Sequence, residues 1–333
     1  MTQSGPMLDQ KLPVSVIMLT LNEEVNLPGA IDSAKRWAGD IFIVDSCSTD
    51  RTVDIALENG VKIVQRPFTN FGDQWNFALD KLPITTEWTM KLDPDERCSP
   101  ELVADLANQV TAPTRLVGYS VLRRLWFMGK PLRVYQPVLR VWKTGRCRFT
   151  DVLVNEHPIV DGPTGTLRGH LEHLDSPNLY HWWEKQNRYT TMEAISAVSG
   201  RRLAAEPRLF GSPLERRMLF KKYLHLVPLR YQLLWLNEVL VRGAWASGTT
   251  GLSWAHLRVE VMRMIELKTL EMRTTGVVPE MPRSPGAEYD PRVLASELQT
   301  SVMGRRAGSL GQDGQVRPTR AALSRTRSQR LAR

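Results

Sequence analysis

Acidic side chains stand at or just beyond the ends of three of the four segments that are predicted to be buried β-strands. Asp93 and Asp95, separated by one residue, follow the fourth strand, Glu23 follows the first, and Asp45 ends the second. Two carboxylates at a strand end can reach one cation, and Mg²⁺ or Mn²⁺ binds carboxylate oxygens while sharing itself with substrate phosphates. The pattern therefore predicts a divalent-metal site that stabilises a leaving diphosphate as a Lewis acid.

Glycine-rich phosphate loops are missing from this part of the sequence. No Gly-x-Gly-x-x-Gly follows the first strand, and no Gly-Lys-Ser/Thr occurs. Dinucleotide-binding folds and P-loop NTPases need such glycines so that backbone N–H groups can approach phosphates. Acidic residues in their place favour phosphates that are held through a metal ion.

The elements that must position these side chains alternate between strand-like and helix-like segments. Apolar, β-rich runs predict strands at 14–20, 41–45, 62–65 and 88–92. Helices are predicted at 24–37, 51–59, 73–82 and 99–109. The alternation favours an α/β fold with a mostly parallel, doubly wound sheet, in which ligands bind beyond the carboxyl ends of the strands.

The second half of the chain has a different texture. Residues 118–173 hold short strand-like runs separated by Gly, Lys and Pro turns, which predict mixed or antiparallel additions to the same sheet. Residues 176–203 and 213–273 are predicted to be helical, with apolar and basic positions interleaved. From about Pro279 the chain is rich in Pro, Gly, Ser and Arg and poor in apolar residues, which predicts disorder.

The positive charge is concentrated at one end of the sequence. The formal net charge is +9, and eight Arg against one Asp in residues 301–333 account for +7 of it. Nucleic-acid-binding modules carry their basic residues on a folded face. The nearly neutral body therefore disfavours a nucleic-acid-binding protein, and we expect no nucleic-acid partner.

The sequence also bears on location. Cys47, Cys98 and Cys147 are an odd set at wide spacing, which suits a reducing compartment. The N-terminus lacks the apolar core of a signal peptide, and no run reaches the ~18 uncharged apolar residues that a spanning helix needs. We expect a cytoplasmic protein, peripheral on the inner face of the cell membrane.

Three motifs together resemble those of a known family. VSVIMLTLNEE (14–24), VDSCSTDRT (44–52) and LDPDE (92–96) are similar to the family 2 inverting glycosyltransferases, which have the GT-A fold. FGDQWNFAL (71–79) and VNEH (154–157) resemble the subgroup of lipopolysaccharide-core β-1,4-glucosyltransferases. The resemblance covers about residues 13–200 and implies a nucleotide-sugar donor, expected to be a UDP-hexose such as UDP-glucose.

The resemblance implies roles for residues of the donor site. Thr20, Asn22 and Glu23 would lie at the nucleotide end, and Asp45 would contact the base or ribose. Ser46 and Asp50 would shape the loop after the second strand, in which Ser48 and Thr49 are more simply explained as helix caps. Asn76 would face the nucleotide sugar from its helix, or else be a surface amide.

The resemblance also implies the metal ligands. Asp93 and Asp95 would hold the diphosphate through Mg²⁺ or Mn²⁺, and Asp93 would count among the donor-binding residues as well. A third ligand often comes from a histidine late in the domain, so His173, or else His170, is the expected third ligand. Arg140 and its neighbour Lys143 would meet phosphate or acceptor anions, or else form a plain surface pair.

Inversion at the anomeric carbon requires a base that takes the proton of the acceptor hydroxyl. Relatives commonly show His-Glu where this chain has Asn155-Glu156-His157, so Glu156 is the expected base and Asp151 the reserve. The acceptor would be a lipid-linked or cell-surface glycan. Transfer to a polyprenyl phosphate is the alternative within the same class.

The resemblance and the composition divide the chain into four parts. We predict an N-terminal arm at 1–12, a GT-A catalytic domain at 13–205, a helical region at 206–278 and a disordered basic tail at 279–333. Residues 213–245 mix aliphatic, aromatic and basic side chains, which is the composition of a helix that lies in a membrane interface. A membrane surface is therefore an expected partner.

Overall fold

The computed structural model describes residues 11–150, 157–198, 207–211 and 213–279. Its contacts group Met1–Pro291 into one unit and Arg292–Arg333 into another, and the described residues belong to the first. Some predicted features lie outside the described residues. They are the expected base Glu156, its reserve Asp151, most of the predicted arm and the predicted tail after Pro279.

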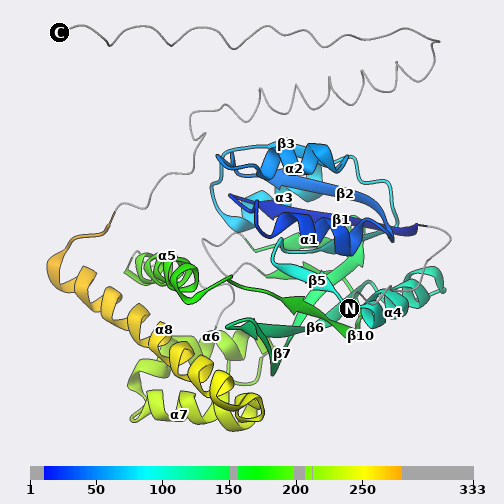
Figure 1. The fold of residues 1–333 in the computed structure, drawn as a ribbon. Coiled ribbons are helices and arrows are strands. Elements are labelled where there is room, and N and C mark those ends of the chain that lie inside the picture. Colours follow the sequence, from blue (N-terminus) through cyan, green and yellow to red (C-terminus); the bar gives the residue numbers. More distant parts are fainter. Residues whose placement is uncertain (1–10, 151–156, 199–206, 212, 280–333) are drawn as a thin grey trace, which may run out of the picture. The chain divides into compact units, whose positions relative to one another are not determined.

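A mixed sheet of eight strands forms the centre of the fold, in the order β3-β2-β1-β4-β7-β6-β10-β5 (Figure 1). Four of its seven neighbouring pairs are parallel, and these include all the pairs among the first four strands. The strands are β1 (Leu12–Thr20), β2 (Ala38–Asp45), β3 (Lys62–Gln65), β4 (Trp88–Lys91), β5 (Glu96–Cys98), β6 (Gly118–Phe127), β7 (Lys130–Lys143) and β10 (Thr164–His173). A separate pair joins β8 (Cys147–Phe149) to β9 (Pro158–Val160).

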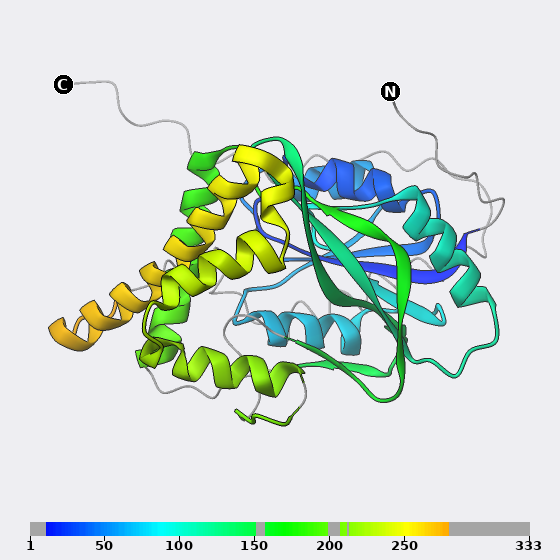
Figure 2. The same ribbon diagram turned by 90° about the horizontal axis from the view of Figure 1, so that it is seen from below.

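The first four helices follow the predicted alternation. They are α1 (Leu27–Ala34), α2 (Thr52–Glu58), α3 (Phe71–Lys81) and α4 (Pro100–Thr111). Val14, Val16 and Met18 alternate along β1 and pack in one core with apolar residues of α1, α2 and α4. Figure 2 shows α3 across the sheet from α1, so helices cover both faces, as in a doubly wound fold.

Strand register brings the polar strand ends together at one edge. Thr20, the last residue of β1, pairs with Asp45, the last of β2, and Asp45 in turn pairs with Gln65, the last of β3. Since the strands are parallel, their carboxyl ends meet at the same edge of the sheet. The loops that follow them therefore share one space with the turn after β4.

One strand was not expected from the sequence. The three-residue strand β5 follows the Asp93–Asp95 turn and pairs antiparallel with β10, with Glu96 opposite His173. A strand this short has no periodicity of its own, and its partner lies far along the chain. Its consequence for the site is that the end of β10 is brought directly to the acidic turn.

The helical half is divided into more short helices than the predicted helical ranges indicated. It contains α5 (Leu179–Val198), α6 (Pro213–Tyr223), η1 (Leu224–Leu226), α7 (Arg230–Leu236), η2 (Asn237–Val241), η3 (Ala244–Ser247) and α8 (Gly248–Thr275). Backbone in the left-handed region at Leu229, Gly243 and Gly248 marks three of the breaks. Trp182, Val239 and Trp254 pack with apolar residues of β6 and β7, which fixes these helices to the sheet. Within the described ranges, no helix has the length and apolar character required to cross a bilayer.

Candidate functional site

The turn after β4 presents two carboxylates in different settings. Arg140 donates through Nη2 to Asp93 Oδ2 at 2.7 Å and to Glu96 Oε1 at 2.5 Å, and the Asp93 N–H donates to the other Glu96 oxygen at 3.1 Å. Burial acts to raise the pKa of Asp93, but Arg140 and Lys91 outweigh it and lower that pKa to about 2. Asp93 is therefore ionised at neutral pH. Arg140 was expected to meet phosphate or acceptor anions or else to form a plain surface pair. It is buried, so it is not a surface residue, and it binds this carboxylate.

Asp95, two residues on, lies in a second cluster. Its Oδ2 atom is 3.3 Å from His173 Nε2 and 3.0 Å from Lys185 Nζ, and Asp175 Oδ1 lies 2.8 Å from the same lysine nitrogen. Burial acts to raise the pKa of Asp95, but Lys185 and His173 hold it well below its usual range. The carboxylates of Asp95 and Asp175 are thus compensated by the ammonium group of Lys185.

The chemistry of these donors fits a divalent metal ion. One ligand atom from each of Asp95, His173 and Asp175 lies within 4.8 Å of the other two, and Asp95 is buried. The Nδ1 atom of His173 is buried without a hydrogen-bond partner among the described residues. Carboxylate oxygens suit both Mg²⁺ and Mn²⁺, and an imidazole nitrogen is a common ligand of divalent metals.

Glu23 brings the end of β1 into the same electrostatic environment. Burial is the main cause that raises its pKa from 4.5 to about 7, and the charges of Asp95 and Asp93 add to the effect, whereas Asn26 and Lys185 oppose it. Its side chain accepts from Asn26 Nδ2 at 2.9 Å. A carboxyl group with this pKa can exchange a proton near neutral pH.

Asp45 organises the loop after β2. Its buried carboxylate accepts from Thr20 Oγ1 at 2.7 Å, from the Ser48 backbone N–H at 2.8 Å and from Gln65 Nε2 at 3.0 Å. Ser48 Oγ adds a fourth bond at 2.5 Å. The side chain therefore joins three strand ends, and contact with a nucleotide base or ribose stays a prediction. Ser46 is buried beside it and accepts from Gln74 Nε2 at 3.2 Å.

The loops after β1 and β2 are tied to each other by side chains. Asn22 Oδ1 accepts from the Thr49 N–H at 2.8 Å, and Ser48 Oγ accepts from the Asn22 N–H at 2.8 Å. Asp50 accepts from Thr52 and from the backbone of the first loop. Asn22 and Cys47 both have left-handed backbone, with φ of 55° and 61°. Such strain in non-glycine residues clusters at functional sites, where the surroundings over-determine the conformation.

Asn76 has a clear structural partner. Its amide donates to the Phe149 carbonyl and accepts from the Phe149 N–H, both at 3.0 Å, so it fastens α3 to β8. Trp75, the neighbouring residue, stacks on the Phe149 ring at 5.0 Å. The predicted role of Asn76 toward the nucleotide sugar stays a prediction.

The remaining predicted side chains, those of His170 and Lys143, lie apart from the Asp95 cluster. His170 lies 2.9 Å from Glu172 Oε1 and is not a member of the metal cluster, so of the two histidines only His173 is beside Asp95. Lys143 Nζ lies 3.7 Å from Glu87 and over the Trp88 ring. It ends β7 where the antiparallel pairing places it opposite the first residue of β4, at the far end from the acidic turn.

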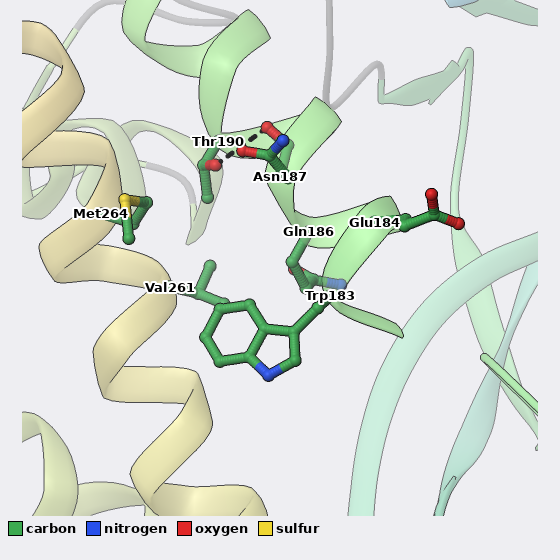
Figure 3. Close-up of a pocket in the computed structure, with 7 residues that line it drawn as sticks. All are labelled: Trp183, Glu184, Gln186, Asn187, Thr190, Val261 and Met264. Atoms are coloured by element: carbon green, nitrogen blue, oxygen red, sulfur yellow. Dashed lines mark hydrogen bonds between the residues drawn. The ribbon is translucent and has the colours of Figure 1, made fainter. Parts of the chain in front are cut away.

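A cavity of about 330 Å³ lies between α5 and α8, away from this chemistry. In Figure 3, Trp183 of α5 and Val261 and Met264 of α8 point toward one another, whereas Glu184 points away. Gln186, Asn187 and Thr190 complete the lining. The cavity is mainly apolar, and the strand-end carboxylates are not part of it.

Sequence reasoning did not find Asp175 and Lys185. Asp175 follows the end of β10 in the way that Asp93 follows β4, so a search of every strand end would have found it. Lys185 comes from the second turn of α5, and no local pattern connects it to Asp95. Its position depends on how α5 packs, which is a tertiary property.

Comparison with known proteins identifies the family of the chain. Residues 15–168 match the family described as "Glycosyl transferase family 2". The lipopolysaccharide core biosynthesis glycosyltransferase LpsC of Rhizobium meliloti (strain 1021) is 31% identical over 216 residues, which cover 61% of this chain and 79% of that protein. An uncharacterized glycosyltransferase of Rickettsia prowazekii (strain Madrid E) is 24% identical over 208 residues, covering 57% of this chain and 70% of that one.

Among solved structures, the mannosyltransferase PcManGT from Pyrobaculum calidifontis, in complex with GDP-Man and Mn²⁺, aligns with a TM-score of 0.46 at 16% identity. The alignment covers 79% of this chain and 88% of that one. The match to the family and the extent of the relationship to LpsC decide the assignment. The chain belongs to glycosyltransferase family 2.

Proposed function

We propose that this glycosyltransferase moves a hexose, with glucose the expected sugar, from a UDP-sugar to a lipid-linked or cell-surface glycan with inversion and with a divalent metal. The observation that carries the proposal is the cluster of Asp95, His173 and Asp175 beside Asp93 at the carboxyl edge of the sheet. The leaving nucleoside diphosphate carries negative charge on both of its phosphates. A metal held at this cluster would supply the compensating positive charge.

Donor binding would use the edge that β1 and β2 share. Thr20 and Asp45 pair there in register, and Asn22, Glu23 and Ser46 follow within a few residues. Hydrogen bonds across the two loops keep this edge preorganised, so little ordering would be required when the nucleotide binds. Asp93 is ionised and fixed by Arg140. It would act as a further metal ligand or orient the sugar beside the diphosphate.

The transfer step needs a base on the acceptor side. The acceptor hydroxyl oxygen forms a bond to the anomeric carbon as the bond to the diphosphate oxygen breaks, and the nucleoside diphosphate leaves with the bonding electron pair. The hydroxyl proton goes to a carboxylate, for which Glu156 is the first choice and Asp151 the second. General-base catalysis of this kind typically contributes ~10²–10⁴-fold.

The kinship with LpsC favours a glycan acceptor of the lipopolysaccharide-core type. A polyprenyl phosphate acceptor differs chemically, since its attacking group is a phosphate oxygen that carries no proton at neutral pH. Such an acceptor would not need Glu156 or Asp151 as a base. The acceptor class can therefore be separated by the effect of Glu156→Gln.

A membrane surface is the proposed docking partner of the α7–η2 segment. Leu229, Leu233, Leu236 and Leu240 recur at helical spacing and are 43–70% exposed. The segment is held in place, because Val239 is buried and Arg230 binds Glu266 of α8. The preceding helix α6 carries Arg216, Arg217, Lys221 and Lys222 in its sequence. An apolar stripe next to basic residues suits an anionic lipid surface.

A donor screen tests the enzymatic part of the proposal. Release of nucleoside diphosphate is measured from UDP-, GDP- and dTDP-sugars with Mn²⁺ or Mg²⁺, with and without a glycan acceptor. We expect turnover with a UDP-hexose and added metal, and none after chelation. Preference for a GDP- or dTDP-sugar would overturn the donor assignment, and full activity in excess chelator would overturn metal assistance.

A further inference from the structure

Lys185 already occupies the centre of the proposed metal site. Its Nζ atom lies 3.0 Å from Asp95 Oδ2, 2.8 Å from Asp175 Oδ1 and 3.3 Å from the Asp175 carbonyl oxygen. Asp95 and Asp175 are two of the three residues that gather within 4.8 Å of one another, and the third is His173. The lysine is four-fifths buried, so its charge is compensated by these carboxylates and little by water.

The helix that carries Lys185 is fixed, whereas the ammonium group reaches the cluster on a flexible four-carbon stem. Asn178 caps the start of α5 by accepting from the His181 N–H at 2.9 Å. Trp182 packs edge-on against Phe127 of β6, and Lys268 of α8 binds the other side of the helix. A lysine side chain has a flexible stem of four carbons, so its ammonium group can leave one position without moving the helix.

A metal ion and this ammonium cannot share the cluster. The lysine already bonds to Asp95 Oδ2 and Asp175 Oδ1, and these are two of the three residues that would hold the metal. Two cations a few ångströms apart also repel strongly where little water screens them. We propose that Lys185 is an internal cation, which compensates Asp95 and Asp175 while no metal is bound and withdraws when a divalent metal arrives.

This exchange rests on the metal role in the proposed function and adds two consequences. Without the lysine, two close carboxylates would repel each other, so Lys185 stabilises the metal-free enzyme at the expense of metal affinity. Once withdrawn, the ammonium becomes available to an anion, and the diphosphate of the donor is the anion proposed for this site. Metal and nucleoside diphosphate should therefore bind more tightly together than apart, and Lys185 should contribute to that coupling.

Mn²⁺ binding to the metal-free enzyme tests the inference directly. Lys185→Met keeps most of the length of the side chain and removes the competing charge. We expect its Mn²⁺ affinity, measured by calorimetry without nucleotide, to rise about 10–100-fold over the wild type. Its melting temperature without metal should fall, and saturating Mn²⁺ should restore it. Lys185→Gln, whose amide can still donate to the carboxylates, provides a second test if the methionine variant does not fold.

Lys268→Met is the matched control. Lys268 lies on α8 and donates to Asn187, Thr190 and Thr191, which are neutral groups. Its removal should leave Mn²⁺ affinity unchanged. Equal or weaker Mn²⁺ binding by both Lys185 variants would overturn the inference alone. Absence of Mn²⁺ binding in the wild type and in the variants would overturn it together with the metal role of the site.

Discussion

Asp95 is the residue on which the metal site depends most. It is buried, it faces both His173 and Lys185, and its carbonyl oxygen accepts from the Leu174 N–H at 2.8 Å. Its side chain therefore serves the cluster, and its backbone serves the junction of the acidic turn with β10. A change confined to the carboxylate separates these two roles.

Asp95→Asn should lower turnover by at least ~10²-fold, because the metal that balances the leaving diphosphate loses a charged ligand. Folding should survive, since Lys185 keeps its contact with Asp175 at 2.8 Å. Nucleoside diphosphate release and the melting temperature measure the two effects. Asp54→Asn, on an exposed face of α2, is the control and should change neither. Wild-type turnover in Asp95→Asn would refute the metal site.

Glu23 should make stability depend on pH in an unusual direction. Its pKa is 4.5 when unfolded and about 7 in the folded chain, mainly because of burial. Between these values the unfolded state loses the proton while the folded state keeps it. Stability contributed by this group therefore falls as pH rises from about 4.5 to 7 and stays low above that.

Glu23→Gln removes this titration. Urea unfolding at pH 5 and pH 8 should show the variant gaining about 1–3 kcal/mol relative to wild type at the higher pH, since the group is only partly buried. The metal-free protein is used at both values so that metal binding does not contribute. A difference between variant and wild type that is the same at pH 5 and pH 8 would show that Glu23 ionises normally.

At the scale of elements, the position of β10 depends on one glycine. Gly169 has φ of 78°, and a Cβ atom built there would meet the backbone of Leu102 and Glu101 at the start of α4. Backbone atoms at a capped helix start cannot step aside. Gly169 thus permits the close approach that leads β10 to His173 and the metal cluster.

Gly169→Ala should lower the free energy of unfolding by more than about 2 kcal/mol, since it adds a clash to the ~1–2 kcal/mol that left-handed backbone costs an L-residue. Gly60→Ala is the matched comparison, because Gly60 has a similar φ of 68° with nothing within 4 Å of its added Cβ. It should cost only the backbone term. Equal losses in the two variants would show that the contact with α4 is not tight.

Local patterns predicted the elements whose signals are local. The family assignment and the α/β GT-A class are confirmed, and β1 to β4 and α1 to α4 occur where the alternating runs predicted them. β5 could not be predicted, because its pairing with β10 is made across more than 70 residues of chain. The site residues, too, could be predicted only where the sequence signal is local. Strand ends revealed Asp93 and Asp95, whereas Lys185 and the buried setting of Arg140 depend on tertiary packing.

At the scale of the whole molecule, the α7–η2 stripe should control membrane binding. The double change Leu233→Glu and Leu236→Glu places two charges on that face, and sedimentation with vesicles containing about one-third anionic lipid should fall at least ~10-fold. Leu57→Glu, at an exposed leucine of α2, should sediment as the wild type does. Undiminished sedimentation of the double variant would place the membrane contact elsewhere or remove it.

Calorimetric titration of UDP into the wild-type enzyme, with Mn²⁺ and then with excess chelator, tests the central claim most directly. The claim is that the carboxyl edge of β1, β2 and β4 binds a nucleoside diphosphate through a metal held by Asp95, His173 and Asp175. We expect binding with Mn²⁺, with affinity reduced at least ~10²-fold by chelation and, in the presence of Mn²⁺, by Asp95→Asn. Equal UDP affinity with and without metal, or in the wild type and Asp95→Asn, would contradict it.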